Sequence, residues 1–305
     1  MVVRAAEALR VDTAAARVIR HLEAHGLEVI LLKGSALGFL YADDGPRTYA
    51  DVDLLVDPAR HEEAGALLAG LGYRSLAAGL APHEQVAHAT TFLADDGPAV
   101  DLHRTLAGIG ADPSETWGEL RTRTQDHDLV GHSVRILDGA ARALHVALHV
   151  AQSGPGFEKP SADLDRALRV VDEETWAEAG HLADRLTATP AMAAALRSAP
   201  AGRELADRLG LPTRLPLRLD LRQRTTSPLA GLLDRLARTP GTRAKARLVL
   251  RSAVPSSAAV RLAVPVAARG GPWVVAGYAI HTGRTIAGLL RGLPPLATAV
   301  LRRRR

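Results

Sequence analysis

The fold is decided by residues 28–56, which read EVILLKGSALGFLYADDGPRTYADVDLLV. An apolar run ends at Gly34-Ser35, a short helical segment follows, and a second apolar run carries Asp51 and Asp53. Because side chains alternate along a strand, the two aspartates are expected on one face, where they repel each other unless a cation lies between them. A Gly-Ser turn at a helix start can bind phosphate through backbone N–H groups. The stretch therefore predicts a site for a divalent cation and a nucleoside triphosphate.

A third carboxylate is expected on a neighbouring strand. Chemistry at a triphosphate needs positive charge, which two Mg²⁺ ions roughly 4 Å apart supply when carboxylates bridge them. Asp51 and Asp53 are two such ligands, and Asp101 is the third candidate because an unpaired charge within the apolar run 99–102 would be costly. Mn²⁺ is the alternative metal. The competing interpretation places Asp51 and Asp53 on the wet face of an edge strand.

Three basic side chains accompany these carboxylates. Lys33 precedes the Gly-Ser turn and could add charge to a phosphate site, although a strand residue can point either way. Arg47 lies in the loop that leads into the aspartate strand, so it is either a phosphate-binding cation or an ordinary solvated residue. His103 shares the face of Asp101 and could support a metal ligand, act as a general base or simply pack in its strand.

These motifs, in this order, resemble the nucleotidyltransferase superfamily related to polymerase β, and most closely its poorly characterised bacterial group with a helical C-terminal half. The matching elements are Leu32-Lys-Gly-Ser35, Arg47, Asp51-Val-Asp53 and Val100-Asp-Leu-His103. The resemblance implies metal-dependent transfer of a nucleoside monophosphate from an NTP such as ATP to a hydroxyl acceptor, with release of pyrophosphate. It also implies that Gly34 and Ser35 contact the β- and γ-phosphates. The acceptor stays open among small molecules, peptides and RNA.

The pattern along the chain predicts an α/β (α+β) fold. Residues 1–138 are expected to form a nucleotidyltransferase-like domain with a small mixed sheet and flanking helices, residues 139–252 a helical domain, and residues 253–305 a basic segment rich in Pro and Arg. Strands are expected at 28–32, 51–56, 85–94, 98–106 and 133–137. Helices are expected at 11–26, 35–41, 58–71, 139–152, 161–171, 174–187, 190–198, 201–209, 227–238 and 241–252.

Composition narrows the function classes. The chain of 305 residues has no Cys, which excludes disulfides and thiol chemistry and fits a reducing compartment. No stretch approaches the roughly 18 apolar residues of a membrane span, and the first twenty residues alternate charged and apolar positions unlike a secretory signal. Cytoplasmic localisation, or a peripheral position at the membrane, is therefore expected. The phosphate loop of P-loop enzymes, the Gly-X-Gly-X-X-Gly of Rossmann enzymes and a complete nucleophile elbow are all absent from the sequence.

The net charge of +5 is unevenly distributed. Residues 241–305 contain eleven Arg, one Lys and no Asp or Glu, which makes this segment +12 and leaves −7 for the remainder. The segment could bind nucleic acid or an anionic membrane surface, or it could cover the acidic remainder of the molecule. Its few aromatic residues disfavour stacking on single-stranded nucleic acid, and Pro294-Pro295 are expected to interrupt a helix there.

Three further polar side chains fall in the predicted helical half. His145 and His149 lie four apart and so share a helix face, where they are either metal ligands or satisfied histidines between the two halves of the protein. Asp163 resembles an acidic position of the family and could line a cleft, with a helix cap or a solvated face as the alternative.

Two other functions compete with nucleotidyl transfer. The first is a catalytically inactive protein that binds a nucleotide or a partner. The second is a peripheral membrane protein or polyanion binder that acts through residues 241–305.

Overall fold

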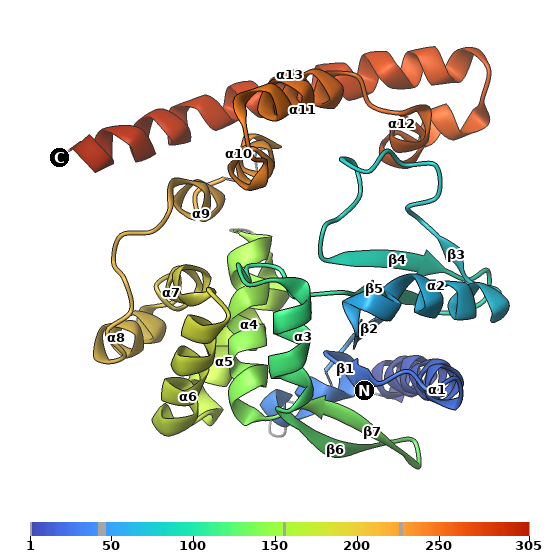
Figure 1. The fold of residues 1–305 in the computed structure, drawn as a ribbon, viewed down its shortest axis with the longest axis vertical. Coiled ribbons are helices and arrows are strands. Elements are labelled where there is room, and N and C mark those ends of the chain that lie inside the picture. Colours follow the sequence, from blue (N-terminus) through green and yellow to red (C-terminus); the bar gives the residue numbers. More distant parts are fainter. Residues whose placement is uncertain (1, 42–46, 155–156, 226–227, 305) are drawn as a thin grey trace. The chain divides into compact units, whose positions relative to one another are not determined.

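The computed structural model describes residues 2–41, 47–154, 157–225 and 228–304, and its chain forms two compact units (Figure 1). The first unit consists of Met1–Leu76, Ala87–Gln152 and Phe157–Thr213, and the second of Ala77–Val86, Ser153–Gly156 and Arg214–Arg305. The first unit thus holds both the sheet and the helices that follow it directly. The predicted boundaries near residues 138 and 252 stay predictions.

A seven-stranded mixed sheet with strand order β3-β4-β5-β2-β1-β7-β6 forms the centre of the first unit. β1 pairs antiparallel with β2 and parallel with β7, while β5 pairs parallel with β2 and antiparallel with β4. The strands are β1 (Val29–Leu31), β2 (Asp51–Val56), β3 (Arg74–Ser75), β4 (Ala89–Leu93), β5 (Ala99–His103), β6 (Thr124–Leu129) and β7 (His132–Leu137). This confirms the predicted mixed α/β class and the hairpin of β4 and β5.

One face of the sheet is covered by α1 (Val2–Ala24) and α2 (His61–Gly70). Val52, Leu54 and Val56 of β2 are buried in the same core cluster as the apolar face of α1. Because side chains alternate along a strand, Asp51 and Asp53 lie on the opposite face. The apolar pattern of β2 therefore fixes which face carries the carboxylates.

Several elements differ from the predicted ones. The first helix begins at Val2 rather than near residue 11, and the segment after β1 is a 3₁₀-helix, η1 (Gly34–Tyr41). Helix α3 (Pro113–Arg121) and strands β3 and β6 were not predicted. α3 begins as η2 (Pro58–Arg60) does, since an aspartate before a proline accepts a backbone N–H bond within the first turn.

Five helices that pack beside the sheet end within three residues of their predicted limits. They are α4 (Gly139–Ser153), α5 (Glu158–Val170), α6 (Glu173–Arg185), α7 (Thr189–Leu196) and α8 (Pro200–Arg208). α4 is buried along most of its length, as expected for a helix with apolar residues around most of its surface. α4 covers the face of the sheet that carries the carboxylates.

The second unit is helical and has a small core. Its elements are α9 (Leu217–Arg222), α10 (Pro228–Arg238), α11 (Thr242–Ala253), α12 (Ser257–Ala263), η3 (Pro265–Arg269) and α13 (Pro272–Arg304). Val260, Val264 and Ala267 form the core, and Glu84 accepts hydrogen bonds from the backbone N and Oγ of Ser256, both at 2.6 Å. The first residue of the predicted helix 227–238 lies outside the described residues.

The prediction that Pro294-Pro295 interrupt a helix is wrong. α13 continues through both prolines to Arg304. A proline removes one backbone donor from the ladder but leaves its φ angle helical, so a long helix can carry the loss. No helix within the described residues is long and apolar enough to cross a membrane.

Replacing a buried leucine of α1 tests the packing of this helix on the sheet. Leu22 is fully buried, so Leu22→Ala should lower the free energy of unfolding by about 2–5 kcal/mol through the lost contacts and the cavity left behind. Leu9→Ala on the same helix is the matched control, because Leu9 is 56% exposed and the change should stay within about 0.5 kcal/mol. Urea unfolding measures both values, and equal losses would contradict this packing.

Candidate functional site

The two carboxylates at the centre of the site lie on neighbouring parallel strands. The register of β2 and β5 pairs Asp53 directly with Asp101, and it pairs Asp51 with Ala99. Directly paired residues project from the same face of a sheet, so the side chains of Asp53 and Asp101 are adjacent. Asp53 is 1% exposed, whereas Asp51 and Asp101 are half-buried.

Asp53 is held as a buried anion by two basic side chains. Its Oδ1 accepts a hydrogen bond from Lys33 Nζ at 2.7 Å and lies 3.1 Å from His103 Nε2. Burial alone would raise the pKa of Asp53, but the charge of Lys33 and the bond to His103 outweigh burial and hold this pKa far below its usual value. Asp53 is therefore ionised throughout the pH range of ordinary biochemistry.

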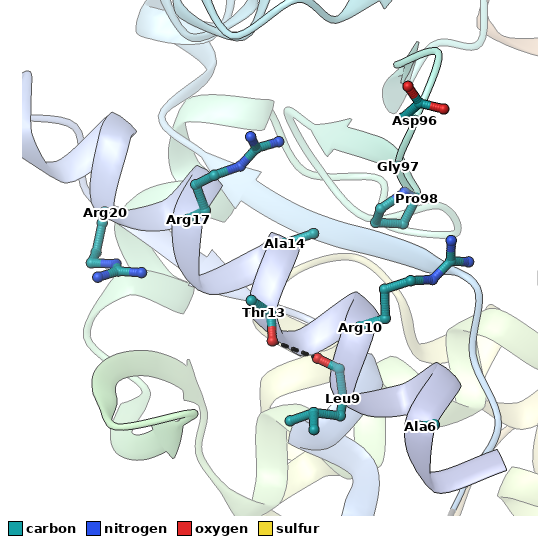
Figure 2. Close-up of a pocket in the computed structure, with 10 residues that line it drawn as sticks. All are labelled: Ala6, Leu9, Arg10, Thr13, Ala14, Arg17, Arg20, Asp96, Gly97 and Pro98. Atoms are coloured by element: carbon teal, nitrogen blue, oxygen red, sulfur yellow. Dashed lines mark hydrogen bonds between the residues drawn. The ribbon is translucent and has the colours of Figure 1, made fainter. Parts of the chain in front are cut away.

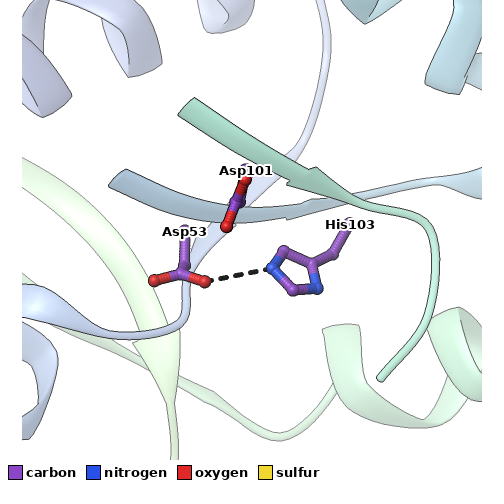
Figure 3. Close-up of side chains that lie close together, drawn as sticks. All are labelled: Asp53, Asp101 and His103. Carbon is purple, nitrogen blue, oxygen red and sulfur yellow. Dashed lines mark hydrogen bonds and ion pairs between the residues drawn. The ribbon is translucent and has the colours of Figure 1, made fainter. Parts of the chain in front are cut away.

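A metal ion fits the donors that meet here. Asp53, Asp101 and His103 each offer a ligand atom, and these atoms all lie within 4.8 Å of one another (Figure 3). Asp53 Oδ2 is buried and has no hydrogen-bond partner in the described parts of the chain, while Asp101 Oδ1 accepts a bond from Thr91 Oγ1 at 2.6 Å. Two carboxylates and an imidazole suit a divalent cation, and an unsatisfied buried carboxylate oxygen is costly without one.

Asp51, predicted as a third carboxylate ligand, is not part of this group. It lies two residues before Asp53 on the same face of β2, and its role as a metal ligand stays a prediction. The structure instead brings His103 to the carboxylates. His103 shares the face of Asp101, as expected. Its contact with Asp53 depends on the register between the strands, which cannot be inferred from the sequence.

The Gly-Ser turn lies immediately after β1. Gly34 has φ +67°, and a Cβ at this position would lie 3.3 Å from the Tyr49 ring, so the turn requires glycine for its backbone and for the space. Ser35 Oγ lies 3.2 Å from His127 Nε2. The phosphate contacts of Gly34 and Ser35 stay predictions. The tight turn that would make these contacts has Tyr49 packed against it.

Arg47 is not a solvated loop residue. It is 4% exposed, and its guanidinium donates from Nη2 to Asp163 Oδ2 at 2.8 Å and from Nε to Asp163 Oδ1 at 3.4 Å. The hydroxyl of Tyr41 also donates to Asp163. The alternative that Asp163 is a cap or a solvated residue is also wrong, since it is 1% exposed. Its burial could have been inferred from Pro160, Leu164 and Ala167, which lie on the same face of α5 and are buried.

Removing the carboxylate of Asp163 should be costly. Asp163→Asn leaves the buried Arg47 charge without its counter-charge, so the free energy of unfolding should fall by about 3–5 kcal/mol in a urea titration. Asp165→Asn on the same helix changes an exposed carboxylate and should alter stability by no more than about 0.5 kcal/mol. A loss below about 1 kcal/mol for Asp163→Asn would show that the buried pair does not hold α5 in place.

Histidines of α4 lie over the carboxylate face. A cavity of about 20 Å³, with room for roughly one water molecule, is lined by Lys33 and His103 from the sheet side and by His145 and His149 from α4. Burial, followed by the charge of Lys33, lowers the pKa of His145 far below its usual value and that of His149 to about 4. Both imidazoles are therefore neutral near pH 7, and neither belongs to the metal-compatible group.

The lowered pKa of His149 predicts acid-sensitive stability. Between pH 6.5 and pH 4 the unfolded chain protonates this imidazole while the folded chain does not, so the free energy of unfolding falls as the pH falls. The free energy of unfolding of His149→Gln should therefore fall less than that of the wild type over this interval. Urea titrations at several pH values should show a difference of up to about 3 kcal/mol between the two falls. Parallel curves for His149→Gln and the wild type would contradict the assignment.

A wider concavity lies elsewhere on the first unit. It measures about 660 Å³ and is bordered by Arg10, Arg17 and Arg20 of α1 and by the turn Asp96-Gly97-Pro98 (Figure 2). None of the predicted site residues lines it. Lys33 and His103 line the small cavity under α4 instead, and the wider concavity is a separate surface.

Comparison with known proteins gives a family match over much of the chain. The sequence model of the family described as "Uncharacterised nucleotidyltransferase" matches residues 2–201. Among solved structures, the antibiotic-resistance factor ANT(2'')-Ia has 17% identity and a TM-score of 0.41, over 58% of this chain and 95% of that chain. The lincosamide antibiotic adenylyltransferase LnuA, crystallised with lincomycin, has 12% identity and a TM-score of 0.36, over 51% and 94%. An antigenic nucleotidyltransferase-like protein from Paracoccidioides brasiliensis has 15% identity and a TM-score of 0.36, over 59% and 93%. No curated protein matches the chain.

Proposed function

Because the chain belongs to the family of uncharacterised nucleotidyltransferases, we propose that it transfers a nucleoside monophosphate from an NTP to a hydroxyl acceptor and releases pyrophosphate. The observation that carries the proposal is the pairing of Asp53 with Asp101 across β2 and β5, with a buried Asp53 oxygen that lacks a partner among the described residues. The proposed acceptor is a small molecule, a peptide or RNA. The proposed compartment is the cytoplasm, in keeping with the cysteine-free composition.

The carboxylates are proposed to hold the metal. Asp53 and Asp101 would bind Mg²⁺, with Asp51 as the predicted further ligand where two ions are present and Mn²⁺ as the alternative metal. Such ions supply positive charge against the phosphate oxygens of the NTP. Lys33 adds a fixed cation at Asp53, and its ammonium keeps the buried carboxylate ionised and ready to bind a cation.

The turn after β1 is proposed to bind the outer phosphates. Gly34 and Ser35 would offer backbone N–H groups and a hydroxyl to the β- and γ-phosphates, in a turn whose backbone conformation requires glycine at position 34. Arg47 is committed to Asp163 through two nitrogens, and its third, Nη1, has no partner among the described residues. The predicted phosphate contact of Arg47 would use this nitrogen.

The proposed transfer forms one bond and breaks one bond at the α-phosphorus. The acceptor oxygen forms a bond to the α-phosphorus, the bond from this phosphorus to the α–β bridging oxygen breaks, and the electron pair leaves with pyrophosphate. We assign the acceptor proton to His103, whose Nε2 faces Asp53 Oδ1 and whose Nδ1 has no partner among the described residues. Asp53 would then orient the imidazole by accepting its Nε2–H, as a carboxylate orients a basic histidine in other hydrolytic and transfer enzymes.

Removing the charge of Asp53 tests the proposal. Wild type should bind at least one of the four NTPs in calorimetry with Mg²⁺, and Asp53→Asn should weaken that binding at least tenfold because a neutral amide is a poor ligand for the ion. Asp101→Asn should do the same, while Asp128→Asn, an exposed carboxylate on β6, should bind as the wild type does. Thermal melting of each variant confirms that it is folded.

The competing functions give different results. A protein that only binds nucleotide would keep its NTP affinity without Mg²⁺ and in both variants, and it would release no pyrophosphate with any acceptor. Absence of binding for all four NTPs would reject the catalytic proposal. The basic residues 241–305 have no role in the proposed transfer, and their partner is a separate property of the chain.

A further inference from the structure

The basic segment folds into helices that expose large apolar side chains. Residues 241–305 carry twelve positive charges and no negative ones, and they include α11, α12 and α13 (Figure 1). Within the second unit, the described side chains of this segment form no ion pair. A surface of this kind combines unneutralised positive charge with exposed hydrophobic groups, and a soluble monomer rarely carries both together.

α11 is amphipathic and almost entirely exposed. None of its residues with a described burial is buried. Arg243, Arg247 and Arg251 follow one another at intervals of four and so share one face of the helix. Leu250, which is 76% exposed, lies beside the row of arginines, whereas Val249, 46% exposed, lies on the opposite side of the helix. The helix thus presents a row of arginines with an exposed leucine next to it.

α13 presents a stripe of large apolar residues to solvent and buries small ones, while its other large apolar residues, such as Leu289 and Leu296, are half-buried. Val275, Ile286, Leu290, Leu293 and Leu301 recur at intervals that return to one side of the helix, and each is at least 50% exposed. The buried positions of the same helix are small: Gly277, Gly288, Gly292 and Ala299. A Cβ at Gly277 would lie 2.5 Å from that of Ala267, so this small-residue side packs tightly inside the second unit. The exposed apolar side is therefore not the one that stabilises the unit.

We propose that α11 and α13 bind an anionic membrane surface and lie along it. Arginines beside exposed Leu, Ile and Val are the features of a helix that rests at the boundary of headgroups and acyl chains, held by buried apolar area and by attraction to acidic lipids. Charge decides against pairing of this segment with the same segment of a second copy, because the two would bring +12 against +12. Side-chain type decides against nucleic acid, because the exposed stripe is aliphatic and offers no stacking platform.

Vesicle flotation with the full chain tests the proposal. The wild type should float with vesicles of phosphatidylcholine containing about 30% phosphatidylglycerol, should not float with phosphatidylcholine alone, and should dissociate as salt rises from about 50 to 300 mM. The triple variant Arg243→Gln/Arg247→Gln/Arg251→Gln should bind about a hundredfold more weakly, at roughly tenfold or less for each lost charge. Leu290→Ser/Leu293→Ser should also weaken binding, because it removes apolar area on α13.

Two matched controls separate this surface from general charge and hydrophobicity. Arg10→Gln/Arg17→Gln/Arg20→Gln removes three exposed arginines of α1, and Val130→Ser removes a side chain that is 51% exposed in the first unit. Both should float as the wild type does. Equal loss in the α1 triple variant, equal binding to neutral vesicles, or no binding to either vesicle would each overturn the proposal.

Other partners give distinct results. Two results would overturn the membrane assignment in favour of another partner. One is a dimer in light scattering that the Leu290→Ser/Leu293→Ser variant dissociates. The other is retention on RNA in place of vesicles. NTP binding by the tail variants should equal that of the wild type. The failure of membrane binding and the failure of nucleotide binding are therefore observed independently.

Discussion

The buried negative charge of Asp53 is the constraint on which the first unit depends. A carboxylate that is 1% exposed is unfavourable by itself, and the structure compensates it with Lys33 from the end of β1 and His103 from the end of β5. His103 lies on β5 and Lys33 follows β1 by two residues, and since β5 and β1 flank β2, three neighbouring strands must keep their register for the charge to be satisfied. One oxygen remains without a partner among the described residues, which means that the compensation is incomplete at the point where a cation would bind.

A second buried charge ties the helical part of the unit to this sheet. Arg47 and Asp163 are separated by 116 residues in the chain, yet their charged groups are 2.8 Å apart and almost fully excluded from solvent. Neither partner is tolerable without the other, so the position of α5 is coupled to the loop that leads into β2. A buried pair adds little net stability compared with apolar packing, but it selects one arrangement over its alternatives. The same loop and helix lie near the carboxylates, since Arg47 interacts electrostatically with Asp53 and Lys159 of α5 with Asp51.

The sequence predicted those features that depend on local pattern. The apolar run with Asp51 and Asp53, the hairpin before Asp101 and the helices after residue 139 all follow from periodicity and turn residues. Strand β6 was missed because TQDHDL is polar up to its last residue, Leu129, and such a strand depends on its pairing with β7. Contacts between distant segments, such as Arg47 with Asp163 and His103 with Asp53, depend on register and helix placement, which no local pattern encodes. α3 could have been found, since Asp112-Pro113 is the same kind of helix-start signal as the Asp57-Pro58 that begins η2.

One side of α13 in the second unit departs from the usual arrangement of a packed helix. A helix normally buries its large apolar residues and exposes its small or polar ones, because area removed from water is the main stabilising term. α13 buries glycines and alanine, holds Leu289 and Leu296 half-buried, and leaves a stripe of Val, Ile and Leu exposed outside the core of Val260, Val264 and Ala267. Packing within the unit does not use this stripe, whereas an external apolar phase would cover it. The arginines then act on the same surface, since an acidic lipid layer supplies both the apolar phase and the counter-charge that the segment itself lacks.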